Sequence, residues 1–185
     1  MRRYAAVVVA IAAVLSLVGR TFAADAYPKT IVAAAKVVNG ATTVTSQVTI
    51  KINRLVEPSR RDRVINGLKA NGYQGFMDAL RPLPVIGSIA TQSNEVMVRY
   101  AWESEAEGKK RLIIVSDKPL FFLAADASKA RAGFELTFVE LVFDAKGGAT
   151  GTMAGAARVK PAPNDGIVLQ DFATEPIQLT VAAAK

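Results

Sequence analysis

The stretch Ala41–Leu55, ATTVTSQVTIKINRL, alternates between two kinds of side chain over most of its length. One face carries Val44, Ser46, Val48, Ile50 and Ile52, and the other carries Thr45, Gln47, Thr49, Lys51 and Asn53. A period of two is that of a β-strand with one buried and one wet face. Asn39-Gly40 precedes it and favours a tight hairpin, because both residues accept positive φ. The sequence therefore predicts a hairpin with Thr30–Val38 as the first strand.

Similar short apolar or alternating runs continue to the end of the chain. They occupy residues 85–91, 95–102, 110–116, 120–124, 134–143, 149–160, 167–172 and 176–181. The run Phe134–Phe143 is apolar on both faces and predicts a central strand. Short strands at even spacing predict a mainly β (α+β) fold, namely an antiparallel β-sandwich or β-barrel of about 8–9 strands.

The period changes to that of a helix between residues 59 and 81. Pro58-Ser59 precedes the first predicted helix, and Asn71-Gly72 is a helix stop signal. The second predicted helix places Tyr73, Phe76, Met77 and Leu80 on one stripe. We therefore predict a two-helix insertion whose apolar stripes, including Phe76 and Leu80, are buried against the sheet.

The N-terminus has the features of an export signal. Arg2 and Arg3 precede an apolar run over residues 5–18, and Thr21-Phe22-Ala23 offers small residues for cleavage. As a helix, that run covers about 21 Å, against a hydrocarbon core of roughly 30 Å. We interpret residues 1–23 as a signal peptide and 24–185 as a single secreted or periplasmic domain. No stable membrane span is expected after cleavage.

The chain contains neither cysteine nor histidine. Their absence excludes Ser–His and Cys–His hydrolysis, thiol redox chemistry and the common zinc sites. Phosphate-binding, dinucleotide-binding and nucleophile-elbow motifs are also missing from the sequence. We expect a non-catalytic protein without metal or cofactor. An exported domain without disulfides fits a bacterial envelope or culture medium better than a eukaryotic secretory route.

The net charge is +7, from 23 Lys and Arg against 16 Asp and Glu. Removing Arg2, Arg3 and Arg20 with the signal leaves 20 against 16, or +4. Such a charge is ordinary for a soluble domain and gives no reason to expect nucleic acid. Two basic clusters, Arg60–Arg63 and Lys109–Arg111, are candidates for contact with anionic lipid or polysaccharide. We interpret both as solvated faces.

Four residues are candidates for a binding site. Tyr100, Trp102 and Phe138 alternate within predicted strands, where aromatic side chains line either a ligand cavity or the core. Glu140 interrupts the most apolar strand on the face of Phe138. If that face is the interior, Glu140 is a buried charge, and Arg54 or Arg99 is the expected partner.

A second group of acidic residues lies in a short polar stretch. Glu103, Glu105 and Glu107 precede Gly108 and three basic residues. We interpret them as a solvated hairpin tip rather than a calcium or acid–base site.

Several stretches spread over residues 48–181 carry a further signal. They are Ile52–Arg54, Ser59–Arg63, Met77–Leu80, Val98–Ala101, Ser116–Leu120, Phe138–Leu141 with Asp144, and Pro176–Leu179. In their order and spacing the chain resembles a family of uncharacterised secreted bacterial proteins with a single β-rich domain and no assigned activity. The resemblance implies an exported single domain and no site residues.

Three functions remain open at this stage. The first is an exported, non-catalytic envelope or extracellular domain with a binding or accessory role toward an unidentified envelope component. The second is a carrier that holds a small apolar ligand in a barrel cavity. The third is a hydrolase that uses carboxylates only, which requires Glu140 and a second carboxylate about 5–10 Å apart.

Overall fold

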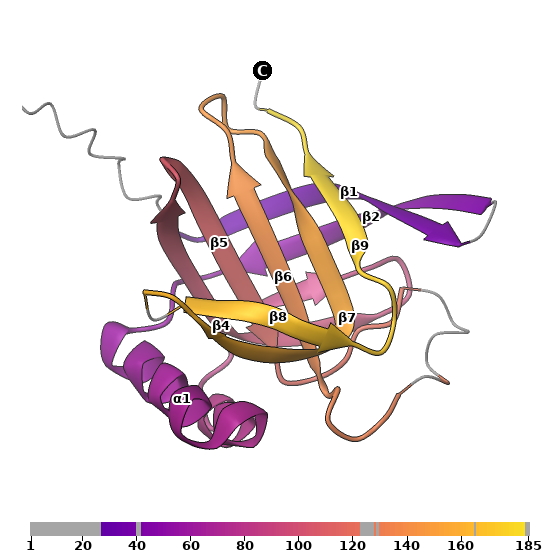
Figure 1. Ribbon diagram of the computed structural model, residues 1–185. Coiled ribbons are helices and arrows are strands. Elements are labelled where there is room, and N and C mark those ends of the chain that lie inside the picture. The colour runs from indigo at the N-terminus through magenta and orange to yellow at the C-terminus, as the bar shows by residue number, and fades with distance from the viewer. Residues whose placement is uncertain (1–26, 40–41, 123–127, 129, 165, 184–185) are drawn as a thin grey trace, which may run out of the picture.

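A sheet of nine antiparallel strands curls round until strands from its two ends meet (Figure 1). The computed structural model describes residues 27–39, 42–122, 128, 130–164 and 166–183. The predicted signal peptide lies outside this range. The strands are β1 Lys29–Asn39, β2 Thr42–Ile52, β3 Gly87–Ala90, β4 Glu95–Ala106, β5 Lys109–Ser116, β6 Leu136–Phe143, β7 Ala149–Ala162, β8 Gly166–Phe172 and β9 Ile177–Val181. The helix α1 spans Pro58–Leu80, between β2 and β3.

Pairing of β6 with β7 closes eight of these strands into a barrel. Around the barrel the order is β6, β5, β4, β3, β2, β1, β9 and β7, and β8 is an extra strand attached to β7. The predicted mainly β fold is confirmed, and the barrel rather than the sandwich is the architecture. β1 and β2 pair along their whole length, from Lys29 with Ile52 to Asn39 with Thr42, which confirms the predicted hairpin.

The barrel interior is filled by the buried face of the alternating strands. Val48, Ile50 and Ile52 of β2 are each 0% exposed and pack with residues from every other barrel strand in one apolar cluster. Strand β6 contributes Val139 and Leu141 to this interior. An eight-stranded barrel is just wide enough for side chains to fill it, which is the arrangement here.

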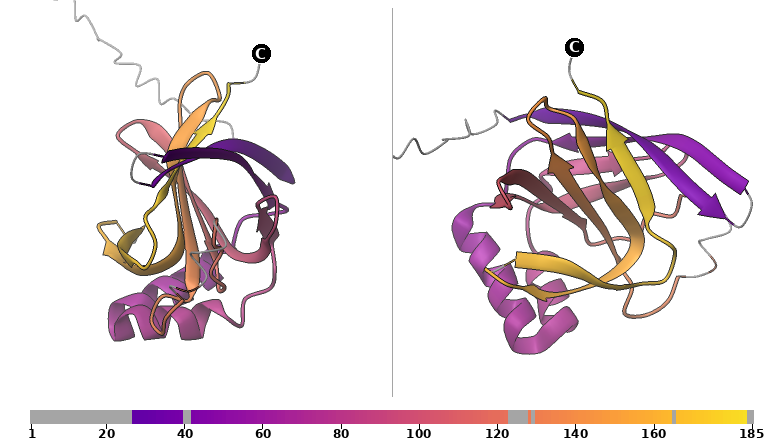
Figure 2. Two further views of the ribbon diagram at one scale, coloured as in Figure 1. Left: turned by 90° about the vertical axis from the view of Figure 1, so that its right-hand side faces the viewer. Right: turned by 45° about the horizontal axis from the view of Figure 1, so that its top comes forward.

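A second apolar cluster lies outside the barrel wall. The outer face of β4 to β7 contributes Tyr100, Val115 and Phe138, and α1 covers them with Phe76 and Leu80, each 0% exposed. Figure 2 shows α1 beside one end of the strands, where its main contact is with β7. The predicted burial of Phe76 and Leu80 is confirmed. Strand β6 is apolar on both faces because it separates the two clusters.

The two predicted helices form one helical element, and this element is interrupted at the predicted stop signal. Asn71 and Gly72 have non-helical angles, and Gly72 has φ 60°. They form a kink rather than a loop, and the helix continues on both sides. The two halves of α1 pack closely against each other at Gly67 and Gly75, which have no side chain. A Cβ on Gly67 would lie 2.5 Å from the carbonyl oxygen of Gly75. Glycine at all three positions permits this arrangement.

The predicted strand at residues 120–124 is also wrong for its described part. Leu120 to Phe122 are not strand, and residues 123 and 124 lie outside the described range. The Leu120 N–H donates to the carbonyl oxygen of Gly155 on β7 at 2.7 Å. Pro119, just before it, has no N–H to extend a ladder.

Tyr73 links the second half of α1 to the start of β6. Its hydroxyl donates to Glu135 Oε2 at 2.8 Å and accepts from the Glu135 N–H at 3.0 Å. Burial raises the pKa of Tyr73 well above its usual 10.0, and the hydrogen bond to Glu135 adds to this. For Glu135, burial acts to raise the pKa. Hydrogen bonds from Tyr73 and from backbone N–H groups outweigh that effect and hold the pKa below its usual 4.5.

These shifts predict a pH dependence of stability. Because the pKa of Glu135 is lower in the folded state than in the unfolded state, its contribution to the free energy of unfolding is complete above about pH 4.5. That contribution is lost as the pH falls through the pKa of the folded state. Tyr73→Phe should reduce the free energy of unfolding by about 1 kcal/mol at neutral pH. It should also flatten the loss on acidification, measured by urea denaturation at several pH values. An unchanged acid slope in Tyr73→Phe would contradict the assignment.

Candidate functional site

The strongest candidate site is a hollow on the outside of the barrel wall, with a volume of about 120 Å³. We call it the outer hollow. Five segments line it: α1, the strands β4 and β5, the turn between β7 and β8, and the start of β8. Its lining residues are Arg61, Tyr100, Trp102, Ser104, Glu105, Arg111, Ile113, Pro163, Asn164, Gly166 and Ile167.

Strand β4 supplies the aromatic wall of the outer hollow. Tyr100 and Trp102 are two residues apart, so they share the outer face of the strand. The Arg61 guanidinium lies over the Trp102 ring, 4.7 Å from its centroid, which is a cation–π contact. Burial raises the pKa of Tyr100 to about 12, although the nearby Arg61 acts to lower it. Tyr100 therefore presents a neutral hydroxyl at physiological pH.

Arg111 of the neighbouring strand β5 supplies a cationic part of the lining. Its Nε donates to Glu140 Oε1 at 2.6 Å, and its Nη2 donates to the carbonyl oxygen of Ile167 at 3.4 Å. The two side chains of the ion pair are 17% and 30% exposed for Arg111 and Glu140 respectively. Since a guanidinium has five N–H donors in a fixed plane, these contacts orient Arg111 and leave it able to bind a ligand.

Glu140 is thus paired, but with neither of the expected arginines. It does lie on the face of Phe138, as predicted, because residues two apart in a strand share a face. That face is the outside of the barrel wall and not the interior. Glu140 sits at the margin of the second apolar cluster, where one cation is within reach.

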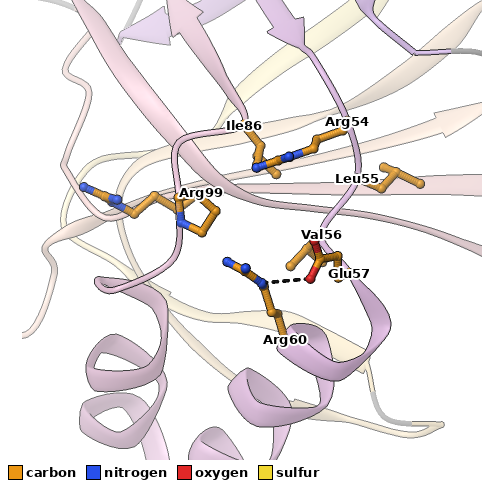
Figure 3. Close-up of a pocket in the computed structure, with 8 residues that line it drawn as sticks. Arg54, Leu55, Val56, Glu57, Arg60, Ile86 and Arg99 are labelled. Atoms are coloured by element: carbon orange, nitrogen blue, oxygen red, sulfur yellow. Dashed lines mark hydrogen bonds and ion pairs between the residues drawn. The ribbon is translucent and has the colours of Figure 1, made fainter.

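Arg54 and Arg99 lie instead beside the loops that flank α1. Figure 3 shows both near Ile86, close to the Arg60–Glu57 ion pair at 2.9 Å. The hollow among these residues has a volume of about 10 Å³, roughly that of a single water-sized probe. It is too small to be a site for an organic ligand.

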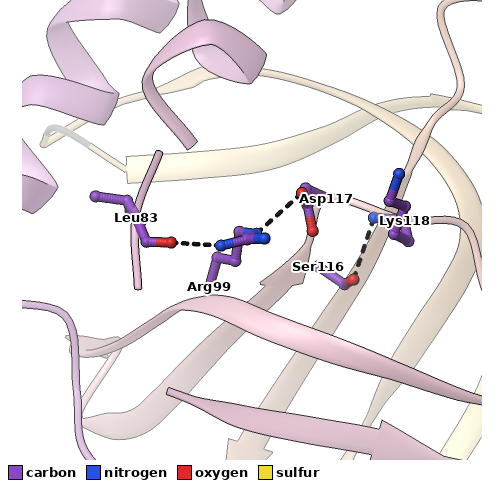
Figure 4. A network of polar contacts seen from close by, with 5 residues as sticks. All are labelled: Leu83, Arg99, Ser116, Asp117 and Lys118. Carbon is purple, nitrogen blue, oxygen red and sulfur yellow. Dashed lines mark hydrogen bonds and ion pairs between the residues drawn. The ribbon is translucent and has the colours of Figure 1, made fainter. Parts of the chain in front are cut away.

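Arg99 has a structural task in that region (Figure 4). Its Nη1 donates to the carbonyl oxygen of Leu83 at 2.5 Å, and its Nε lies 2.9 Å from Asp117 Oδ2. These contacts join the segment after α1 to the turn after β5. Arg99 therefore orders loops rather than neutralising Glu140.

The structure separates the three candidate aromatic residues. Tyr100 and Trp102 line the outer hollow, whereas Phe138 is 1% exposed and packs within the second apolar cluster beneath α1. The aromatic residues do not line a cavity within the barrel. Phe138 is a core residue, which was the alternative interpretation of its pattern.

Each of the two basic clusters contributes one arginine to the outer hollow. Arg61 comes from the first cluster and Arg111 from the second, while Arg63 and Lys109 are exposed. Interpreting both clusters as solvated faces missed these two side chains. Cluster composition gave no reason to separate Arg61 from Arg63. Whether Arg61 or Arg63 faces the outer hollow depends on how α1 is rotated against the barrel. The position of Arg111 depends on the strand register that places it opposite Ser104, which a local sequence pattern does not determine.

The acidic group divides in a similar way. Glu105 lines the outer hollow, and Glu107, at φ 53°, lies in the turn between β4 and β5. Glu103 accepts a hydrogen bond from the Tyr27 hydroxyl at 2.7 Å.

No group of three or more Asp, Glu, His or Cys side chains suited to a metal ion occurs in the described part of the chain. Within that same part, none of the helical structure is long and apolar enough to cross a bilayer.

Comparisons with family models, with curated proteins and with solved structures find no match to this chain. The functional assignment therefore rests on the residues and geometry of the site.

The ion pair between Arg111 and Glu140 should contribute to stability. Glu140→Gln keeps a hydrogen-bond acceptor but removes the charge that faces a largely buried guanidinium. We expect it to lower the free energy of unfolding by about 1–2 kcal/mol in chemical denaturation. Glu105→Gln, an exposed residue on the same hollow, is the control and should change stability by less than about 0.5 kcal/mol. Equal effects would contradict the structural role of the pair.

Proposed function

We propose that the protein is an exported, non-catalytic binding domain that takes one sugar unit of an envelope or extracellular polysaccharide in the outer hollow. The observation that carries this proposal is the convergence of Trp102, Arg61 and Arg111 on one small hollow. Two distant parts of the sequence, α1 and the β4–β5 hairpin, supply these side chains, and each arginine is oriented by a carboxylate or an aromatic ring.

The balance of charge favours a polar but uncharged ligand. Arg61 lies 3.1 Å from Asp62, and Arg111 lies 2.6 Å from Glu140, so each cation has an anion beside it. Glu105 adds a further negative charge at the lining. An anionic ligand would find little net attraction here. The hollow is rich in both hydrogen-bond donors and acceptors instead, as a ligand with many hydroxyl groups requires.

The aromatic wall fits the same ligand class. A sugar ring has an apolar face of C–H groups as well as its hydroxyls, and an indole ring provides a large, rigid apolar surface. Side chains that bind small molecules commonly combine such a surface with a few placed polar groups. Trp102 provides the surface here, and Arg61, Arg111 and Asn164 provide polar groups.

The size of the hollow favours part of a polymer over a free small molecule. Pockets for complete small ligands usually measure about 300–1,000 Å³. A hollow of about 120 Å³ is smaller than this and suits contact with one unit, and exposed Pro163 and Asn164 at its margin offer contacts to neighbouring units. A polysaccharide chain therefore fits the hollow better than a free small molecule does.

The two other functions have less support. A carrier needs space inside the barrel, and the interior-facing side chains form one packed apolar cluster. A hydrolase that uses carboxylates only needs Glu140 as a reactive group, and its carboxylate is engaged by Arg111 at 2.6 Å. Export rests on the signal-peptide pattern of residues 1–23 and on the resemblance to secreted bacterial proteins.

Trp102 makes the proposal directly testable, because it is the only tryptophan in the chain. Titration with oligosaccharides from neutral envelope and extracellular polysaccharides should shift or quench its fluorescence in a saturable way. Arg61→Gln and Arg111→Lys should each weaken binding by about tenfold or more, since each loses a planar, oriented donor. Isothermal titration calorimetry would provide an independent affinity.

Matched controls exist within the same basic clusters. Arg63→Gln and Lys109→Gln remove exposed cations that do not line the outer hollow, and should leave the affinity unchanged. If no saccharide changes the Trp102 signal, or if all four variants bind alike, the proposed function is wrong.

A further inference from the structure

The hairpin of β1 and β2 extends past the strand that neighbours it. β2 pairs with β1 over all of Thr42–Ile52, but with β3 only over Thr49–Ile52. Across the described residues, no strand pairs with the other edge of Thr42–Val48. In Figure 1 the hairpin projects from the right side of the barrel. We call residues 42–48 on this side the free edge.

The backbone groups that the free edge presents can be identified. The Asn53 N–H donates to the carbonyl oxygen of Ile86, just before β3, at 2.8 Å, so Asn53 points toward the β3 side. In a strand, successive residues direct their N–H and C=O groups to opposite sides. The register of β2 shows no shift against β1 or β3. The outward-pointing residues of the free edge are therefore Thr43, Thr45 and Gln47.

The free edge lacks the features that usually prevent edge pairing. Exposed edges are commonly interrupted by charged side chains, by proline or by bulges. The sequence TTVTSQV contains no charge, no proline and no glycine, and it is rich in residues that favour strands. Its pairing with β1 is also free of bulges. Such an edge is suited to accept another strand.

There is also space beside the free edge. β3 ends at Ala90, and the chain turns away at Thr91, whose N–H donates to the carbonyl oxygen of Asn94 at 2.8 Å. A hollow of about 230 Å³ lies at this point, lined by Gln47, Thr49, Ala90, Thr91 and Gln92. An incoming strand could therefore pair with β2 on the side of β3, beyond the point where β3 ends.

We infer that the free edge pairs with the same edge of a second copy of this chain, antiparallel and two-fold symmetric about Thr45. This register places Thr45 opposite Thr45 and Thr43 opposite Gln47. All three outward-pointing residues of each copy then exchange backbone hydrogen bonds, about six in total. A two-fold pairing satisfies both edges at once and closes the assembly as a dimer.

The side chains agree with this occupant. Thr–Thr and Thr–Gln neighbours across strands form favourable polar pairs. Lys51, the nearest charge on β2, lies outside this stretch and is already paired with Ser88 of β3, so no like charges of β2 are opposed. On the other face, half-buried Val44 would lie beside Ser46 of the second copy. A cationic chain with an uncharged edge gives no electrostatic preference for an acidic or basic partner, and self-pairing needs none.

Sedimentation equilibrium of the purified protein tests the inference. The fraction of dimer should rise with protein concentration over about a hundredfold range, as a monomer–dimer equilibrium requires. Thr45→Lys should weaken the dimer by about tenfold or more, since two lysines would then be opposed. Thr180→Lys is the matched control and should dimerise as the original protein does. It introduces the same charge at an exposed strand position with β1 on one side and β7 on the other.

A cross-link provides a second measurement that does not depend on stability. The chain has no cysteine, so Thr45→Cys creates a unique thiol, and two-fold pairing brings its Cα within about 5.5 Å of its symmetry mate. Mild oxidation should convert Thr45→Cys, but not Thr180→Cys, to a covalent dimer. A protein that is monomeric at every concentration, or a Thr45→Lys variant that dimerises normally, would overturn the inference.

Discussion

Pairing between β6 and β7 is the constraint on which the other features depend. It joins the two ends of the eight-stranded wall, so the interior can be filled and no barrel strand is left without a neighbour. The approach of the two strands is close, since a Cβ on Gly151 would collide with the carbonyl oxygen of Glu140. β7 also continues beyond the barrel to carry β8. Closure therefore also places the turn that completes the outer hollow.

Closure also explains why the candidate site lies outside the barrel. With the interior occupied by apolar side chains, ligand contacts are left to the outer surface of the wall. α1 covers part of that surface and provides Arg61, while the β4–β5 pair presents Trp102 and Arg111. The same wall thus has an apolar cluster on each side, and the outer hollow lies at the margin of the cluster outside the barrel. The free edge of β2 belongs to a different part of the barrel and is independent of this site.

Much of the fold follows from local patterns, and much of the site does not. The alternation in residues 41–55 predicted β2, and the apolar stripe around Phe76 and Leu80 predicted the buried face of α1. The stop signal at Asn71-Gly72 located the break in the helix, but it reports backbone preference and did not predict that the two halves pack together at Gly67 and Gly75 as one element. Glu140 shares a face with Phe138 as predicted, but that face is the outside of the wall and not the interior. Its partner depended on strand register, which brought Arg111 rather than Arg54 or Arg99 beside it.

The most direct test of the closed barrel is NMR measurement of the contact between β6 and β7. A closed barrel should give cross-strand nuclear Overhauser effects around the pair Val139–Met153, with amides of both strands among the slowest to exchange with solvent. The closing pair should then be protected as strongly as the hairpin of β1 and β2 near Ile50. Absence of those cross-strand effects, with rapid exchange along β6 and β7, would mean that both are open edges and would contradict the closed barrel.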